Sequence, residues 1–290
     1  MPKIIELIAD IGGSSSRWAL LPADGSDLRL MGQLPGFNPA VHAPETFTSA
    51  AKHALAEALD GAAVPERLTV YGAGCGTDER RQRMRETLAN IVTAGEVIIE
   101  TDLLGAARGM CGDAPGLVLI LGTGMNAGRY DGTALHTPMP SLGWILGDEG
   151  SGADIGKHFL NDAVHGRVPP SVMQEVFGKD QLPATEALHV LSGSGSPSSA
   201  VAALAGKLAA AVDHPYVQEL LAARFAALGS LLRNYFGSHG PCALVATGGI
   251  AKGFNKTLGT SLASFGFDLQ RVEADPMEGL IAWHRARLLR

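Results

Sequence analysis

Short apolar runs alternate with amphipathic stretches along the chain, and glycine-rich turns separate many of them. Apolar runs of about four to eight residues are typical of buried strands, whereas apolar positions at helical spacing indicate helices. The pattern predicts strands over 4–9, 18–21, 28–33, 68–71, 96–100, 117–121, 242–246 and 268–272. It predicts helices over 44–59, 78–91, 101–108, 153–163, 200–212 and 276–289. Such alternation favours an α/β fold.

Two of the apolar runs end in similar turns of small residues. The first leads through Asp10 into two glycines and three serines, and the second leads directly into a glycine–threonine–glycine turn. A strand, such a turn and a second strand form a tight hairpin whose tip exposes backbone N–H groups, and glycine lets the main chain approach an anion closely. Two such hairpins predict a phosphate clamp, with donors from Gly12, Gly13, Ser14, Ser15, Ser16, Gly122, Thr123 and Gly124. An ordinary tight turn is the alternative for each.

The second half of the chain resembles the first in outline, because each has an early glycine hairpin, helices, and a late strand that ends in glycine. We therefore expect a duplicated α/β core with a cleft between its halves. The expected domains are 1–101 and 102–275, with the helix 276–290 packing back on the first domain.

Composition narrows the class of protein. Of 290 residues, 46% are hydrophobic and 18% are charged, enough apolar residues for sizeable cores. A net charge of -6 disfavours nucleic acid as a partner, because phosphate backbones bind concentrated basic faces. Cys75, Cys111 and Cys242 form no C-x-x-C pair, which fits a reducing compartment. With no signal-peptide pattern and no apolar run of about 18 residues, we expect a cytoplasmic protein without a membrane partner.

Three acidic positions are candidates for chemistry. Asp10 ends a strand beside a phosphate-binding turn, where a carboxylate can hold Mg²⁺, although an Asx-turn would also place it there. Asp102 follows a strand and precedes a helix, so it is either a general base or a helix N-cap. Asp148 lies between glycines at a helix start, which favours contact with a ligand over a simple capping turn. Gly248 and Gly249 follow a strand and would let a flat ring approach the backbone.

These segments together resemble a known family. The most specific match is the stretch 147–153 following 121–124, and the resemblance runs from Ile8 to about His284. On these motifs the chain resembles the BadF/BadG/BcrA/BcrD-type ATPases and N-acetylglucosamine kinases of the actin-like/hexokinase superfamily. The resemblance implies a duplicated actin-like (ribonuclease H-like) ATPase fold with two domains and an interdomain cleft. It also implies ATP and Mg²⁺ as cofactors and an amino sugar as substrate, phosphorylated on a primary hydroxyl.

The resemblance also implies a role for each motif. Asp10 and the turns at 12–15 and 122–126 match the family's phosphate loops, and the stretch 247–249 matches its adenosine motif. Asp102 falls on the catalytic base of the sugar kinases. The residues expected to contact the sugar are Asn38, Asp102, Gly143 and Asp148.

Two departures leave questions open. Ser14 to Arg17 stand where the family more usually has a threonine and a lysine, and Met125 stands where a small hydroxyl residue is common. Some relatives hydrolyse ATP to activate a partner protein through a shared iron–sulfur cluster, and this activator or switch is the alternative function. The three cysteines supply no evident pair for such a cluster. The sequence leaves open which amino sugar is the substrate and whether the protein forms a homodimer.

Overall fold

The computed structural model describes residues 4–22, 29–59, 64–192, 196–237 and 242–288. The chain divides into two compact units, of which unit 1 is Met1–Gly112 with Pro276–Arg290 and unit 2 is Asp113–Asp275. The boundary therefore follows Gly112 rather than residue 101, because the helix that begins at Asp102 packs on the sheet of unit 1. No described helix has the length and apolar character needed to cross a bilayer.

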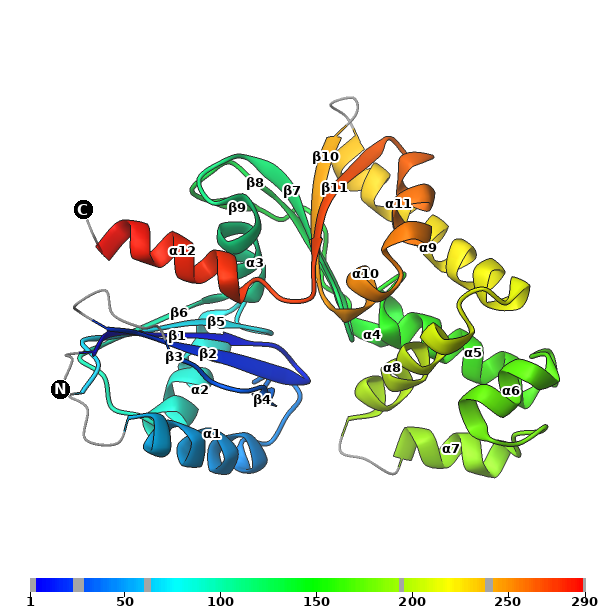
Figure 1. Ribbon diagram of the computed structural model, residues 1–290, viewed down its shortest axis with the longest axis horizontal. Helices are drawn as coiled ribbons and strands as arrows, with labels where there is room; N and C mark the ends of the chain where they lie inside the picture. The colour runs from blue at the N-terminus through cyan, green and yellow to red at the C-terminus, as the bar shows by residue number, and fades with distance from the viewer. Residues whose placement is uncertain (1–3, 23–28, 60–63, 193–195, 238–241, 289–290) are drawn as a thin grey trace. The chain divides into compact units, whose positions relative to one another are not determined.

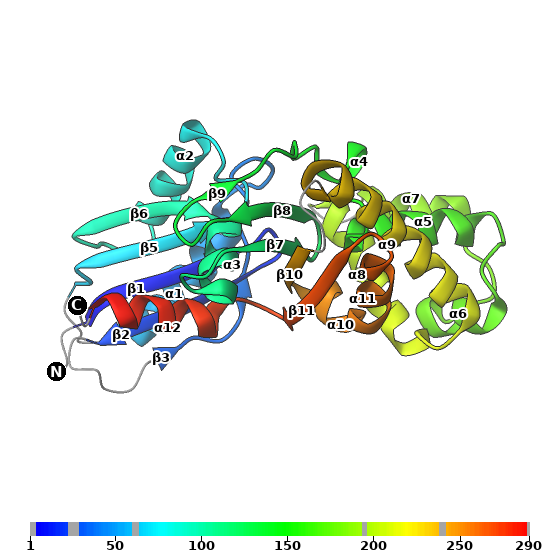
Figure 2. The same ribbon diagram turned by 90° about the horizontal axis from the view of Figure 1, so that it is seen from above.

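A mixed sheet forms the centre of unit 1 (Figures 1 and 2). Its strand order is β3-β2-β1-β5-β6, and β4 pairs with β2. Strand β1 runs antiparallel to β2 and parallel to β5, which runs parallel to β6. Of the strand expected at 28–33, only β3 forms: residue 28 lies outside the described residues, 31–33 are not in a strand, and the next short strand, β4, begins after it. The strands are β1 (Ile4–Ile11), β2 (Ser15–Pro22), β3 (Arg29–Leu30), β4 (Leu34–Pro35), β5 (Arg67–Gly72) and β6 (Glu96–Thr101).

Side-chain alternation along β1 assigns each face of this sheet to a different pair of helices. Leu7, Ala9 and Ile11 pack with helices α1 (Glu45–Ala58) and α2 (Asp78–Ala89). Ile8 points the other way and packs with α12 (Met277–Leu288), which also contacts α3 (Asp102–Cys111). Figure 1 shows α3 and α12 on the sheet face opposite α1 and α2.

Unit 2 has a second mixed sheet, of order β11-β10-β7-β8-β9. Strand β7 makes the predicted antiparallel hairpin with β8, and β10 lies parallel to both β7 and β11. One apolar core joins this sheet to the helices of the unit. The strands are β7 (Gly116–Leu121), β8 (Met125–Tyr130), β9 (Leu135–His136), β10 (Cys242–Thr247) and β11 (Phe267–Glu273).

The segment between β9 and β10 is mainly helical. Its elements are α4 (Gly143–Leu146), α5 (Gly152–Val164), α6 (Pro170–Phe177), α7 (Ala184–Ser192), α8 (Pro197–Lys207), the 3₁₀ turn η1 (Leu208–Ala211) and α9 (Pro215–Phe236). Helices α10 (Gly249–Gly253) and α11 (Asn255–Ala263) link β10 to β11. The helix expected at 200–212 begins earlier, because Ser196 caps it and Pro197 occupies its first turn.

Candidate active site

Strand register brings two predicted aspartates to one edge of the unit 1 sheet. Asp10 is aligned with Tyr71 of β5, and Gly72 is aligned with Thr101 of β6. Since β1, β5 and β6 are parallel, Asp10 and Asp102 both lie at the carboxyl end of the sheet. This is the edge at which parallel α/β sheets usually bind ligands.

Thr101, rather than Asp102, caps helix α3. The Leu104 N–H donates to Thr101 Oγ1 (3.2 Å), and Asp102 is the first helical residue. The Leu103 N–H donates to Asp102 Oδ1 (2.9 Å). Burial raises the pKa of Asp102 to about 6, although that hydrogen bond opposes the shift. A carboxyl group with such a pKa is largely ionised at neutral pH and still basic enough to take a proton from a hydroxyl.

Backbone contacts shape the β1–β2 turn. The Gly12 N–H donates to Ser15 O (2.9 Å), and the Phe37 N–H donates to Gly12 O (3.0 Å). A Cβ on Gly36 would stand 2.3 Å from Gly12 O, so only glycine fits where the two loops touch. A Cβ on Gly13 would meet nothing within 4 Å, which leaves open space at the turn for a ligand.

The three serines of this turn differ in orientation. Ser14 is exposed and Ser15 is half-buried, but Ser16 is buried. The Ser16 hydroxyl donates to Pro35 O (2.8 Å) and accepts from Trp18 Nε1 (3.1 Å). Ser16 therefore joins β2 to β4, and the expectation that it contacts phosphate was wrong.

Asn38 lies in the loop that contacts the turn. Its Oδ1 accepts from the Ala40 N–H (2.9 Å), and a Cβ on Gly74 would stand 2.1 Å from the same oxygen. Phe37 anchors the loop by stacking on Phe47 at 5.3 Å. Asn38 is thus held over the loop that follows β5, with its Nδ2 making no hydrogen bond to any part of the chain that the structure describes.

The second glycine turn is held by the start of helix α5. The Gly152 N–H donates to Gly122 O (2.8 Å), and the Ala153 N–H donates to Thr123 O (3.0 Å). A Cβ on Gly124 would stand 2.9 Å from Asp148 Oδ2, so this turn also touches the predicted acidic residue. A Cβ on Gly122 would meet nothing within 4 Å.

Asp148 has an unusual backbone conformation. Its φ of 62° is positive, which no other described non-glycine residue shares. Such a conformation is costly and is often found at functional sites. The Met125 backbone N–H bonds the Asp148 carboxylate; burial nevertheless raises the pKa of Asp148. The turn and the acidic loop are therefore locked to each other.

A buried ion pair supports this loop, and sequence reasoning missed it. Asp154 is only 3% exposed and accepts from Arg224 Nε (2.8 Å) and from the Gly150 N–H (2.9 Å). The Ser151 hydroxyl in turn accepts from the Asp154 N–H (3.2 Å). The sequence offered a signal, since an aspartate three residues after a serine at a helix start resembles a capping box.

The remaining predicted contacts of unit 2 lie near these turns. Gly248 has a φ of 121°, and a Cβ there would stand 2.4 Å from Leu121 O, so the stretch 247–249 packs on the base of the glycine turn. A Cβ on Gly249 would meet nothing within 4 Å. The buried hydroxyl of Thr247 has no hydrogen-bond partner in the described chain. Gly143 begins α4, and the Gly147 N–H donates to its carbonyl (2.8 Å).

These features fit a nucleotide and its metal. In unit 1, the space beside Gly13 is open enough for a phosphate to approach the turn. In unit 2, the space beside Gly122 and Gly249 is open in the same way, and the buried Thr247 hydroxyl has no partner in the described chain. The described residues contain no group of three or more metal-binding side chains. A single carboxylate such as Asp10 suits Mg²⁺, which usually takes one or two protein carboxylates and completes its shell with phosphates and water.

Comparison with known proteins extends this picture. The sequence matches no family model and no curated protein. Among solved structures, the fold is similar to that of a proposed N-acetylglucosamine kinase of Porphyromonas gingivalis, with 27% identity, a TM-score of 0.81, and coverage of 97% of this chain and 99% of that one. A proposed N-acetylglucosamine kinase of Chromobacterium violaceum is 21% identical, with a TM-score of 0.71 and coverage of 96% and 99%.

A third similar structure is a glucokinase of the ROK family from Streptomyces griseus, in complex with glucose and AMPPNP. It is 16% identical, with a TM-score of 0.57 and coverage of 97% of this chain and 98% of that one. The chain therefore has the two-domain α/β fold of the actin-like sugar-kinase superfamily.

Proposed function

We propose that this chain is an ATP-dependent amino-sugar kinase that phosphorylates N-acetylglucosamine, or a close N-acetylhexosamine or glucosamine, on a primary hydroxyl. The observation that carries the proposal is Asp102, a carboxyl group of raised pKa at the carboxyl end of the parallel strands β1, β5 and β6. The likeness to sugar kinases over nearly the whole chain supports a phosphotransferase.

In unit 1, Asp102 accepts the proton of the attacking hydroxyl, and Asp10 holds Mg²⁺ directly or through water. The turn 12–15 donates backbone and hydroxyl hydrogens to phosphate, while Asn38 offers its Nδ2 to the sugar. Bound Mg²⁺ would offset the negative charge of the phosphates. Since catalysis of phosphoryl transfer is mostly positioning and electrostatics, the rigid backbone contacts at Gly36 and Gly12 serve the reaction directly.

In unit 2, Gly122, Thr123 and Gly124 bind phosphate oxygens, and the stretch 247–249 takes the adenosine. Asp148 accepts hydrogen bonds from sugar hydroxyls, and Gly143 adds a contact near it. The Met125 N–H fixes the direction of the Asp148 carboxylate, and Asp154, paired with Arg224, holds the Gly150 N–H of the same loop. A carboxylate held in this way favours a neutral or acetylated amino sugar over a sugar acid, whose own charge it would repel.

The test is a transfer assay with labelled ATP and a panel of N-acetylglucosamine, glucosamine, N-acetylmannosamine and glucose, with a sample that contains no sugar. We expect one N-acetylated sugar to be phosphorylated and Asp102→Asn to abolish most of that transfer. Phosphate release that no sugar stimulates would contradict the kinase and favour an ATP-driven activator. Calorimetry with each sugar in the presence of AMPPNP separates failure to bind from failure to react.

A further inference from the structure

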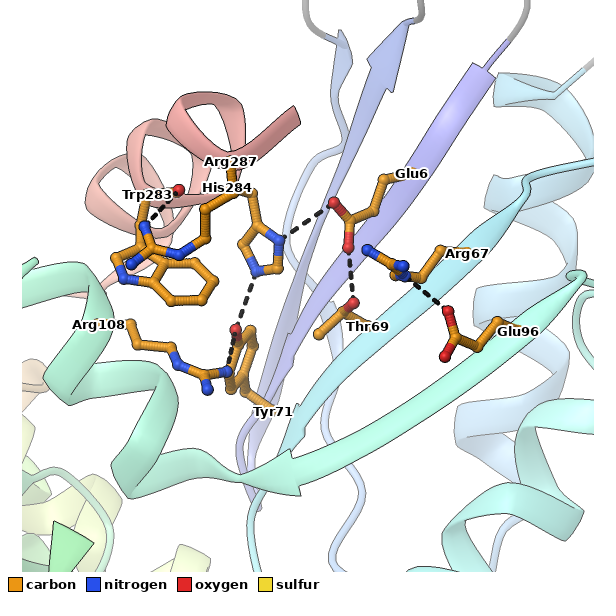
Figure 3. A network of polar contacts seen from close by, with 9 residues as sticks. All are labelled: Glu6, Arg67, Thr69, Tyr71, Glu96, Arg108, Trp283, His284 and Arg287. Atoms are coloured by element: carbon orange, nitrogen blue, oxygen red, sulfur yellow. Dashed lines mark hydrogen bonds and ion pairs between the residues drawn. The ribbon is translucent and has the colours of Figure 1, made fainter. Parts of the chain in front are cut away.

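A chain of hydrogen bonds runs through the buried interior of unit 1, on the sheet face that α12 covers (Figure 3). Thr69 Oγ1 donates to Glu6 Oε1 (2.7 Å), and His284 Nδ1 lies 3.1 Å from Glu6 Oε2. Tyr71 Oη lies 2.9 Å from His284 Nε2, and Arg108 Nη1 donates to Tyr71 Oη (3.0 Å). Glu6, Thr69, Tyr71 and His284 are each at least nine-tenths buried.

Donor chemistry fixes the Arg108 end of this chain. An arginine only donates, so Tyr71 Oη accepts from Arg108 Nη1. His284 then links the phenol to the Glu6 carboxylate through its two ring nitrogens. Burial alone would raise the pKa of Glu6, but the bonds from His284 and Thr69 outweigh it and hold that pKa below its usual value. Burial raises the pKa of Tyr71 to about 12, so the phenol keeps its hydrogen.

The chain ends on helix α3, because Arg108 belongs to that helix. The Arg108 guanidinium also lies 4.4 Å from the centroid of the Trp283 ring, over which Arg287 lies at 3.5 Å. Arg108 Nε is buried without a hydrogen-bond partner in the described chain, which is unfavourable. The position of Arg108 is therefore set by Tyr71 and Trp283.

Two close approaches leave α3 little freedom elsewhere. A Cβ on Gly105 would stand 2.7 Å from the Tyr71 ring, and a Cβ on Gly279 of α12 would stand 1.8 Å from Gly109 O. The helix thus lies directly against Tyr71 on one side and against α12 on the other. A shift of Tyr71 or of α12 is passed to α3.

Asp102 depends on the helix for its position. Its carboxylate accepts hydrogen bonds only from amides of its own helix start, among the described residues. No side chain from another element within the described ranges donates a hydrogen bond to it. The position of the Asp102 carboxylate is therefore set by the position of the first turn of α3.

We propose that the series Glu6–His284–Tyr71–Arg108 is a positioning device that fixes helix α3, and with it the base Asp102, against the sheet. This inference rests on the proposed function for the role of Asp102. Tyr71 and Arg108 are positioning residues, since neither lies at the turns that bind phosphate or sugar.

The test compares two variants that each remove one hydroxyl from the same buried group. Tyr71→Phe cuts the path to α3, whereas Thr69→Val removes a donor to Glu6 that does not lead to α3. We expect Tyr71→Phe to lower kcat about 10- to 100-fold with unchanged KM values, as a displaced catalytic group does. Thr69→Val should keep kcat within about twofold of the wild-type value, although it should lose about as much thermal stability as Tyr71→Phe. Arg108→Met should reproduce Tyr71→Phe, and Arg108→Lys should recover part of the rate.

Amide hydrogen exchange of residues 103–106, without substrates, gives a readout that needs no activity. Faster exchange in Tyr71→Phe but not in Thr69→Val supports the proposal. Equal kcat losses in both variants, or exchange at α3 that neither changes, would overturn it. Should the wild-type protein phosphorylate no sugar, the proposed function fails, and the exchange comparison still decides whether the series holds α3.

Discussion

The two units hold their acidic residues in opposite ways. Among the residues that the structure describes, Asp102 of unit 1 is bonded only at its own helix start, in ordinary helical geometry, and burial raises its pKa to about 6. Asp148 of unit 2 has a φ of 62°, is bonded by an amide of the neighbouring turn, and is supported by the buried Asp154–Arg224 pair. Burial raises the pKa of both carboxyl groups, but Asp148 is in addition strained and bonded to a neighbouring turn, which fixes its direction. The contrast suits proton transfer in unit 1 and ligand orientation in unit 2.

The largest effect should come from removing the base. Asp102→Asn keeps the acceptor for the Leu103 N–H but takes no proton, so kcat should fall roughly 10²–10⁴-fold. Affinities for ATP and sugar should stay within a few-fold. Steady-state kinetics with calorimetry measure both. Wild-type turnover in this variant would remove Asp102 from the chemistry and erase the contrast with Asp148.

The raised pKa of Asp102 predicts two effects of pH, one on activity and one on stability. Because the base must be ionised, kcat/KM of the wild-type enzyme should rise with pH and level off above about 6. Stability should move the other way, because a raised pKa means that the folded state binds more protons than the unfolded state between about 3.8 and 6. At neutral pH, Asp102→Asn should therefore be more stable, by on the order of 1–3 kcal/mol. A kcat/KM that does not rise with pH up to about 6 would contradict the assignment of Asp102 as the base. So would an Asp102→Asn variant that is less stable than the wild-type protein.

The next largest effect should come from breaking the buried Asp154–Arg224 ion pair in unit 2. Asp154→Asn leaves Arg224 unpaired in a largely buried place, and the free energy of unfolding should fall by about 2–4 kcal/mol. The sugar KM should rise more than kcat falls, because Asp148 loses its support. Asp162→Asn is the matched control on the same helix, since its ion pair with Arg167 is more exposed. Equal losses in the two variants would show that burial of the pair is unimportant.

A pair of glycines distinguishes packing from ligand contact in unit 1. Gly36→Ala should lower stability by roughly 1–3 kcal/mol, because its Cβ would press on Gly12 O. Gly13→Ala should leave stability nearly unchanged but weaken ATP binding, because its Cβ would occupy the open space at the turn. Thermal unfolding and nucleotide titration of both variants check this. Normal ATP affinity in Gly13→Ala would argue against phosphate at that position.

The smallest effect is expected at the adenosine motif. Thr247→Val removes a buried hydroxyl that has no partner, so the unliganded protein should be as stable or slightly more stable. If the hydroxyl bonds the nucleotide, the Kd for ATP should rise about two- to tenfold. Thr247→Ser, which keeps the hydroxyl, is the control. Unchanged affinity in the valine variant would leave the orphan hydroxyl without a role in binding.

Local patterns predicted the two hairpins and most strands, because apolar runs and glycine turns are properties of neighbouring residues. The α/β class and the position of Asp102 at a strand end followed in the same way. The inward orientation of Ser16 could not be read from its neighbours, since Pro35 and Trp18 decide it. The same holds for the Asp154–Arg224 pair and the Glu6–His284 contact, which join residues far apart in sequence.

The contact between Gly36 and Gly12 has a consequence for redesign. The loop that carries Asn38 is in backbone contact with the turn that is expected to bind phosphate. A Cβ on Gly36 would collide with Gly12 O, and the Phe37 N–H donates a hydrogen bond to the same oxygen. A graft or library that alters residues 36–42 to change the preferred sugar would disturb the turn at 12–15 at the same time. Variation confined to 40–42, with Gly36 and Phe37 retained, would separate the choice of acceptor from the handling of ATP.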